Sequence, residues 1–446
     1  MRVAVATLGC KVNQYDTATI ESRLRREGCT IVPFAAGADV YIVNSCTVTD
    51  RADAESRRLA RRARRFNPRG RVVMTGCFAQ VSPRRAAIPE VDYVVGLNRL
   101  DDLVRAVRGE MAASQRVLAD DLRTARRVRT LGADTFIGQT RAFLKIQEGC
   151  DLFCTFCIVP FSRGRSRSVP PRQVLEQLEL LADRGFQEVV LTGVHLGGFG
   201  TDLEPPIDLC GLLEMIAARS PLPRVRLSSL DPPEVTSRLL DLLRSSPVFC
   251  PHLHIPVQAA QDDVLRGMRR QYDTALLRAV SAEVRRRLPD AAIGTDVIAG
   301  FPGETDAQFE ATVQLLQELP FTAFHVFPYS RRTGTTAAKL PGQVASRTIT
   351  ERAARLRALS EEKQAAFAHR FVGGVLRVLM EHTPPRPAWL CGYSRNYLRV
   401  ECPGDIALAN RELSVHVEAG QGGRLVGRVV EAVPGVEYER PIADGE

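Results

Sequence analysis

The sequence predicts an α/β protein in three parts: an N-terminal parallel-sheet α/β domain, a central partial (βα)6 barrel, and a small antiparallel β-barrel. Three observations lead to this prediction. Buried apolar strands alternate with helices over residues 1–118, and six further strand–helix units follow over residues 136–365. Over residues 368–433, apolar and polar residues alternate and glycine or proline interrupts the pattern. A chain of 446 residues is long enough for several domains with their own cores.

Composition describes an ordinary globular protein, with 45% hydrophobic and 25% charged residues. The start "MRVAVATLGC" predicts a strand and not a signal peptide, and the sequence has no apolar run of about 18 residues, so we expect a cytoplasmic protein without a membrane span. Eleven scattered cysteines favour reduced thiols and metal ligation over disulfides. The net charge of +9 favours an anionic partner such as nucleic acid, although only four of the 60 basic residues are lysines.

Four apolar strands are expected in the N-terminal domain, at "RVAVAT", "DVYIVN", "RVVMTG" and "VDYVVG". One helix is expected from about Asp16 to Glu27 and another from about Arg51 to Phe66. Buried strands separated by helices indicate a parallel sheet with right-handed crossovers.

Each of the first three strands ends in a short loop that carries one cysteine: Cys10 in "TLGC", Cys46 in "VNSC" and Cys77 in "MTGC". Because the carboxyl ends of parallel strands share one edge, the three thiols are expected to converge. Three thiolates could hold an iron–sulfur cluster and leave one iron without a protein ligand. The alternative is three unrelated, partly buried cysteines. Six arginines between Arg57 and Arg65 indicate either a solvated helix face or a phosphate-contacting one.

The central part has six expected strands, at "AFLKIQ", "EVVLTG", "RVRLSS", "HLHIPV", "AAIGTDVIAG" and "AFHVFPYS". The helices between them are expected to begin near Pro171, Asp208, Glu234, Asp273 and Asp306. In barrels of this kind, functional groups come from the loops at the carboxyl ends of the strands. The loop after the first strand is therefore expected to carry functional groups.

That loop contains "EGCDLFCTFC", in which Cys150, Cys154 and Cys157 follow a C-x3-C-x2-C spacing. Three thiolates on one short loop can hold three corners of a cubane cluster and leave its fourth iron open for a ligand. Zinc is the alternative, but zinc motifs usually pair two C-x2-C units or add histidines at a suitable spacing. Unrelated thiols are the third possibility.

With the aromatic Phe156 before the third cysteine, the loop resembles that of the radical SAM superfamily. The resemblance implies that the open iron binds S-adenosylmethionine and that Phe156 packs near its adenine. Further contacts to this cofactor are expected from residues at or near strand ends: Gly193, Ser229, Gln258 and Asp296.

The C-terminal part has alternating segments at "VLRVLME", "AWLCGYSRNYLRVEC", "ELSVHVEAG" and "RLVGRVVEA", with a surface loop at "TPPRP". Aromatic and basic side chains interleave on what the sequence predicts to be one strand: Tyr393, Arg395, Asn396, Tyr397 and Arg399. That combination suits base stacking and phosphate contacts, so these residues are expected to bind RNA. An ordinary exposed barrel strand is the alternative.

Over nearly its full length the chain resembles the methylthiotransferases, a radical SAM family with two clusters and a C-terminal TRAM domain. "TLGCKVNQYDT" and "VNSCTVTDRADAESRR" are similar to the family's N-terminal domain, and "GTDVIAGFPGET" and "FHVFPYSRRTGTTAA" to its radical SAM core. "GYSRNYLRV" and "GRLVGRVVE" are similar to TRAM. Departures are Ala259 and Ala260, where relatives commonly have "QSGSD", and Phe161, which is often tyrosine.

The resemblance implies a methylthiotransferase domain at 1–118, a radical SAM domain at 136–365 and a TRAM RNA-binding domain at 368–433. It implies two 4Fe-4S clusters: an auxiliary cluster on the N-terminal cysteine triad and the radical SAM cluster on the central one. S-adenosylmethionine would serve twice, as methyl donor to a sulfur on the auxiliary cluster and as the source of a 5′-deoxyadenosyl radical. Aromatic C–H bonds are strong and non-acidic, so a cofactor-borne radical is needed.

"GCKVNQYD" most resembles the MtaB branch, which methylthiolates C2 of N6-threonylcarbamoyladenosine (t6A) at position 37, beside the anticodon of tRNA. The implied partners are a tRNA anticodon loop, which is single-stranded and accessible, and an electron donor such as flavodoxin or ferredoxin. Arg163 and Arg165 could contact substrate phosphates, close the S-adenosylmethionine site, or form structural salt bridges.

Three alternatives stay open. The branch that acts on isopentenyladenosine tends to begin "GCQMN", and the branch that modifies a ribosomal-protein aspartate tends to begin "GCPKN". The basic C-terminal segment argues against a ribosomal-protein substrate. From a different class, the chain could be a non-catalytic RNA-binding iron–sulfur regulator.

Overall fold

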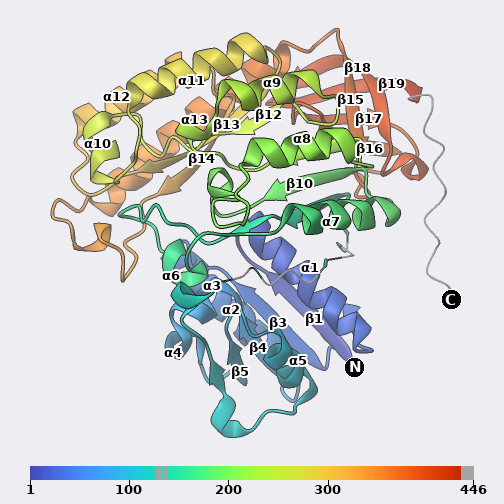
Figure 1. The fold of residues 1–446 in the computed structure, drawn as a ribbon, viewed down its shortest axis with the longest axis vertical. Coiled ribbons are helices and arrows are strands. Elements are labelled where there is room, and N and C mark those ends of the chain that lie inside the picture. Colours follow the sequence, from blue (N-terminus) through green and yellow to red (C-terminus); the bar gives the residue numbers. More distant parts are fainter. Residues whose placement is uncertain (127, 129–131, 134–135, 137, 433–446) are drawn as a thin grey trace.

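The computed structural model describes residues 1–126, 128, 132–133, 136 and 138–432, which form three parts (Figure 1). A parallel α/β sheet, a partial barrel of strands and helices, and a closed five-stranded barrel follow one another along the chain. The predicted α/β class is therefore confirmed. Among the described residues, none of the helices has the length and apolar character needed to cross a membrane.

The N-terminal sheet has six parallel strands in the order β2-β1-β3-β4-β5-β6. The strands are β1 (Arg2–Thr7), β2 (Thr30–Val32), β3 (Val40–Ser45), β4 (Arg71–Thr75), β5 (Tyr93–Val95) and β6 (Val117–Leu118). The edge strands β2 and β6 were not predicted. The helices are α1 (Lys11–Arg26), α2 (Asp50–Phe66), α3 (Gly76–Val81), α4 (Pro83–Ala86) and α5 (Leu100–Arg108).

Helices cover both faces of this sheet because its strands alternate apolar side chains to either side. On one face, Val3 packs with residues of α1 and α5. On the other, Ala4 packs with residues of α2 and α3. Helix α1 begins at Lys11, directly after Cys10, five residues earlier than the sequence predicts.

All six predicted strands of the central part are present and parallel: β7 (Arg141–Lys145), β10 (Glu188–Thr192), β11 (Arg224–Leu227), β12 (His252–His254), β13 (Ala292–Ala299) and β14 (Ala323–Pro328). They form the sheets β7-β10-β11 and β12-β13-β14, which a bridge between Ser229 and His254 joins. The barrel therefore stays open between its outer strands β7 and β14.

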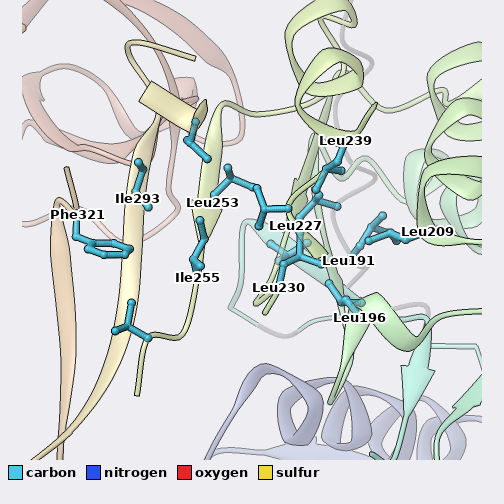
Figure 2. Packing of buried hydrophobic residues seen from close by; sticks show 14 of the residues in the cluster. Leu191, Leu196, Leu209, Leu227, Leu230, Leu239, Leu253, Ile255, Ile293 and Phe321 are labelled. Atoms are coloured by element: carbon cyan, nitrogen blue, oxygen red, sulfur yellow. The ribbon is translucent and has the colours of Figure 1, made fainter. Parts of the chain in front are cut away.

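Helices surround the outside of this partial barrel: α7 (Pro171–Asp183), α8 (Leu209–Arg219), α9 (Ser237–Ser245), α11 (Thr274–Arg287), α12 (Asp306–Glu318) and α13 (Ser346–His369). Leucine and isoleucine side chains from the strands interlock with those of α8 and α9 in one core (Figure 2). Helix α9 begins at Ser237 and not at Glu234, because Pro232–Glu234 form a 3-10 turn and Thr236 caps the helix. Thr305 caps α12, because its side chain accepts a hydrogen bond from the Gln308 N–H.

The C-terminal barrel closes in the order β15-β16-β17-β19-β18. Its strands are β15 (Val375–Met380), β16 (Trp389–Ser394), β17 (Arg399–Pro403), β18 (Glu412–Gln421) and β19 (Arg424–Ala432). The prediction that Tyr393 to Arg399 share one strand is wrong. A turn separates β16 from β17, and Tyr397 within it has a φ of +68°. The alternating aromatic and basic residues therefore do not line up on one face.

This turn packs against the central barrel. Arg395 donates to the carbonyl of Pro223 at 3.1 Å, and Asn396 donates to that of Asp290 at 3.1 Å. Both acceptors precede central strands, so the small barrel covers the amino ends of those strands (Figure 1). Arg395, Asn396 and Tyr397 thus lie at a contact between domains.

Candidate functional site

The central cysteine loop follows the short strand β8 (Gln147–Glu148), and its backbone path depends on Gly149. Gly149 has a φ of +75°, and a Cβ there would lie 1.9 Å from the carbonyl oxygen of Arg165. Only glycine fits this position. The N–H of Cys150 then donates to the carbonyl of Gly164 at 3.1 Å, which fixes where the three thiols begin.

The thiols of this loop receive hydrogen bonds suited to thiolates. Arg270 donates to Cys154 Sγ at 3.2 Å, and the N–H of Val159 donates to Cys157 Sγ at 3.4 Å. Burial raises the pKa of Cys150 to about 11 and that of Cys157 to about 12. Because metals bind the thiolate, a bound cluster must displace these protons.

Sequence reasoning missed Arg270 and the groups around it. Arg270 pairs with Asp231 at 2.5 Å and donates to the hydroxyl of Tyr272 at 3.0 Å. Glu234 accepts from the Asp231 N–H at 2.8 Å and also contacts His195. Asp231 and Glu234 follow β11, so the rule that ligands gather at strand carboxyl ends could have found them.

The N-terminal triad sits where three neighbouring strands end. Cys10 follows β1, Cys46 follows β3, and Cys77 is the second residue of α3, which follows β4. Gly9 has a φ of +98°, and a Cβ there would lie 2.9 Å from Cys46 Sγ, so the first two loops touch. Burial raises the pKa of Cys46 to about 12, and the charges of Cys77 and Cys10 add to that rise. The three thiols therefore converge, as predicted, whereas Cys29 lies in the core.

The spacing of the thiols bears on the choice between zinc and a cluster. In the part of the chain that the structure describes, neither cysteine triad has its three Sγ atoms all within 4.8 Å of one another. A tetrahedral zinc with Zn–S bonds of about 2.3 Å needs its sulfurs about 3.8 Å apart. The sulfurs of each triad are therefore more widely spaced than the ligands of one zinc ion.

A buried ionic network joins the two triads. In α6 (Val159–Arg163), Arg163 is only 2% exposed. It donates to Asn13 Oδ1 at 2.5 Å, pairs with Asp16 at 2.8 Å and pairs with Glu148 at 2.5 Å. Asn13 Oδ1 lies 3.7 Å from Cys77 Sγ. Of the roles open to Arg163, the structure shows the salt-bridged one, which burial makes incompatible with a direct phosphate contact.

Arg165 is different, because its side chain is 61% exposed and pairs with Asp151 at 3.3 Å. It stays available for phosphate, so its RNA contact stays a prediction.

The expected S-adenosylmethionine contacts lie along the central strands. Gly193 follows β10 and Ser229 follows β11, while Gln258 donates its N–H to the carbonyl of Asp296 at 2.8 Å. Phe156 packs against the barrel core. Asp296 lies in the middle of β13 and not near its end. Its carboxylate accepts from His254 at 2.9 Å and His325 at 3.2 Å.

Comparison with known proteins identifies the family. Residues 2–96 match the family described as uncharacterized protein family UPF0004, and residues 144–316 match the radical SAM superfamily. The chain is 38% identical over 93% of both chains to threonylcarbamoyladenosine tRNA methylthiotransferase MtaB of Bacillus subtilis. It is 33% identical, over 96% of this chain and 99% of the relative, to tRNA-2-methylthio-N(6)-dimethylallyladenosine synthase of Methylobacillus flagellatus.

A solved structure shares the fold. The radical S-adenosylmethionine methyltransferase TsrM from Kitasatospora setae aligns with a TM-score of 0.55 at 17% identity, covering 87% of this chain and 80% of that one. Membership of the radical SAM superfamily implies S-adenosylmethionine and one 4Fe-4S cluster, which the Cys150 loop fits. The chain belongs to the radical SAM methylthiotransferase family, whose members are enzymes that transfer sulfur-containing groups.

Proposed function

We propose that this enzyme methylthiolates C2 of t6A at position 37 of tRNA. The observation that carries the proposal is the full-length likeness to relatives named for threonylcarbamoyladenosine, at 38% identity for Bacillus subtilis and 37% for Aquifex aeolicus. The relative named for dimethylallyladenosine is less similar, at 33%. The substrate therefore carries a threonylcarbamoyl group on N6 of adenine.

Two cysteine triads would hold two 4Fe-4S clusters. Cys150, Cys154 and Cys157 would hold the radical SAM cluster, and Cys10, Cys46 and Cys77 the auxiliary one. When bound, the clusters and S-adenosylmethionine would supply a radical that abstracts a hydrogen atom and the sulfur that is transferred. The convergence of the N-terminal thiols and the network from Arg163 to Asn13 support this assignment.

The protein's own residues orient the reaction. Arg270 donates to Cys154 Sγ, and Asp231 pairs with Arg270. Arg163 ties the central loop to α1, so that both triads stay on one side of the barrel. We further propose that the C-terminal barrel is a TRAM domain that contacts the anticodon loop. An electron donor such as flavodoxin or ferredoxin would act in the cytoplasm, where the tRNA is.

Mass spectrometry of tRNA nucleosides from a strain that lacks this gene tests the proposal. We expect loss of the 2-methylthio derivative of t6A, with restoration by the intact gene and none by the Cys154→Ala variant. Loss of the isopentenyl derivative alone would assign the enzyme to the other branch. An unchanged nucleoside profile, together with no 5′-deoxyadenosine from the reduced protein, would remove the enzymatic proposal.

A further inference from the structure

Three phenylalanines differ from the rest because they are exposed. Phenylalanine is among the residues most often buried in folded proteins, and all 18 phenylalanines of the chain lie in its described part. Phe153, Phe161 and Phe327 are 38%, 42% and 37% exposed, whereas the others are buried or partly buried. Exposed apolar side chains that gather at one place mark an interaction site. We call these three residues the phenylalanine rim.

The rim lies on both flanks of the open side of the partial barrel. Phe153 and Phe161 belong to the segment after β8, at the β7 flank, and Phe327 is the next-to-last residue of the other outer strand, β14. The carboxyl ends of parallel strands share one edge. The loop after β14 also reaches the cysteine loop, because the Ala337 N–H donates to the carbonyl of Thr155 at 2.8 Å. The segments that carry the three rings therefore meet at one edge of the barrel.

The N-terminal domain contacts both flanks of this opening. On the β7 side, Asp16 of α1 pairs with Lys145 at 2.7 Å. On the β14 side, Arg332 pairs with Asp53 of α2 at 2.9 Å and donates to Thr47 Oγ1 at 2.6 Å. Thr47 directly follows one of the N-terminal cysteines. The loops that carry the two cysteine triads therefore border the same opening as the rim.

Phe153 has a strained backbone and a cation beside its ring. Its φ of +47° is unusual for a bulky residue, and such strain occurs mostly at functional sites. The guanidinium of Arg165 lies 5.6 Å from the centroid of its ring. Arg165 pairs with Asp151 at 3.3 Å, yet its side chain is 61% exposed. The cysteine loop thus presents an aromatic ring and a positive charge together.

Arginines also lie near the rest of the rim. Arg331 is exposed and follows Phe327 by four residues. Arg269 is exposed in a turn that packs against the cysteine loop, where the Thr155 N–H donates to the carbonyl of Met268 at 3.1 Å. Rings among arginines suit unpaired nucleotides, because bases stack on the rings and phosphates contact the cations.

We propose that the phenylalanine rim stacks the unpaired bases beside the target adenosine and so holds the anticodon loop at the opening between the two triads. The proposal rests on the proposed function, because it takes the anticodon loop of tRNA as the substrate. Every base has a π-face, so the rim positions the loop without selecting its sequence. An electron donor needs to approach only one cluster, whereas the target base must reach both triads, and the rim borders both.

The test separates stacking from charge by the dependence of binding on salt. Affinities for an anticodon stem-loop RNA that carries t6A are measured by fluorescence anisotropy at several salt concentrations on the cluster-loaded protein. We expect Phe161→Leu and Phe327→Leu each to weaken binding about tenfold and to leave the slope of log Kd against log salt unchanged. Leucine is apolar but has no π-face. Phe161→Tyr and Phe327→Tyr keep the ring and should bind within about twofold of wild type.

Two control variants accompany these changes. Arg165→Gln is the charge control, because loss of one phosphate contact should lower the salt slope by about one. Val117→Ala changes a 39% exposed apolar residue on the edge strand β6 and should leave the affinity unchanged. Phe153→Leu should weaken binding as the other leucine variants do. Because Phe153 lies in the cysteine loop, iron content and RNA-independent cleavage of S-adenosylmethionine are measured for each variant.

Unchanged RNA affinity in Phe161→Leu and Phe327→Leu overturns the proposal, and slower reduction of these variants by flavodoxin would then assign the rim to an electron donor. An equal loss of affinity in the leucine and tyrosine variants also overturns it, because a stacking surface tolerates tyrosine. Failure of the wild type to methylthiolate the t6A RNA that it binds would instead overturn the proposed function, so the two failures are distinct.

Discussion

Arg163 in α6 and Asp16 in α1 form a buried ion pair of 2.8 Å that joins the two cysteine-bearing domains. Asp16 also pairs with Lys145 of β7 at 2.7 Å, and Glu148 contacts both cations. Two cations and two carboxylates thus balance one another in the interface. Only Arg163 reaches on to Asn13, which lies beside Cys77.

Replacing Arg163 with glutamine should therefore do two things. The variant removes one of the two cations that pair with the buried carboxylates of Asp16 and Glu148. This loss should lower the free energy of unfolding by about 3–5 kcal/mol. It also releases Asn13 from the central loop, so S-adenosylmethionine cleavage should continue while sulfur transfer falls. Urea unfolding measures the first effect, and the ratio of 5′-deoxyadenosine to methylthiolated product measures the second.

Lys145→Gln is the control for this variant. Lys145 shares Asp16 and Glu148 with Arg163 but has no contact with Asn13. It should cost comparable stability and leave the product ratio unchanged. If both variants change the ratio equally, the link from Arg163 to the auxiliary triad has no separate role.

The cysteine triads could be predicted because each depends on local rules. One loop contains Cys150, Cys154 and Cys157, and the edge of a parallel sheet collects Cys10, Cys46 and Cys77. The six central strands were predictable for the same reason, since each is a short apolar run between helices.

The role of Arg163 could not be predicted, because its partners Asn13 and Asp16 lie 150 and 147 positions away in the sequence. The turn around Tyr397 was missed because alternating aromatic and basic residues suit a strand equally well. Tyr397 has a positive φ and packs its ring against His252 and Arg226 of the central barrel. Both the pairing of Arg163 and the turn around Tyr397 depend on contacts between domains, and such contacts leave no periodic pattern in the sequence.

Removing one cysteine from each triad should separate the two sites. Cys154→Ala and Cys46→Ala should each reduce iron from about eight to about four atoms per chain. Cys154→Ala should abolish 5′-deoxyadenosine formation, whereas Cys46→Ala should retain uncoupled cleavage and lose sulfur transfer. Iron analysis and product chromatography measure these outcomes. Full sulfur transfer by Cys46→Ala would contradict the auxiliary site.

Glu21 in α1 should make stability depend on pH. Burial raises the pKa of Glu21 to about 7, because it outweighs the lowering effect of the nearby Arg25 charge. Between about pH 4.5 and pH 7 the folded state therefore binds more protons than the unfolded state, so stability falls as pH rises. The loss should reach about 2–3 kcal/mol by pH 8.

Glu21→Gln removes this titration, so urea unfolding should show the variant more stable than wild type at pH 8 and little different at pH 4.5. Glu176→Gln removes an exposed carboxylate that pairs with Arg172, and should change stability by less than about 0.5 kcal/mol at either pH. A Glu21 variant with the same pH profile as wild type would show that the carboxyl is not desolvated.

Arg395 should act in domain docking. Its guanidinium donates to the carbonyl of Pro223 and pairs with Glu412 at 2.8 Å, and its side chain is only 16% exposed. Arg395→Ala should lower the free energy of unfolding by about 2–4 kcal/mol and make the small barrel more sensitive to limited proteolysis, because buried charge-assisted bonds are lost.

Arg399→Ala is the matched change, since Arg399 opens β17 with a 36% exposed side chain, 3.5 Å from Glu401. It should weaken tRNA binding without a comparable loss of stability. The opposite pattern, in which Arg395→Ala weakens tRNA binding at unchanged stability, would mean that the turn faces RNA and that its contacts with the central barrel contribute little.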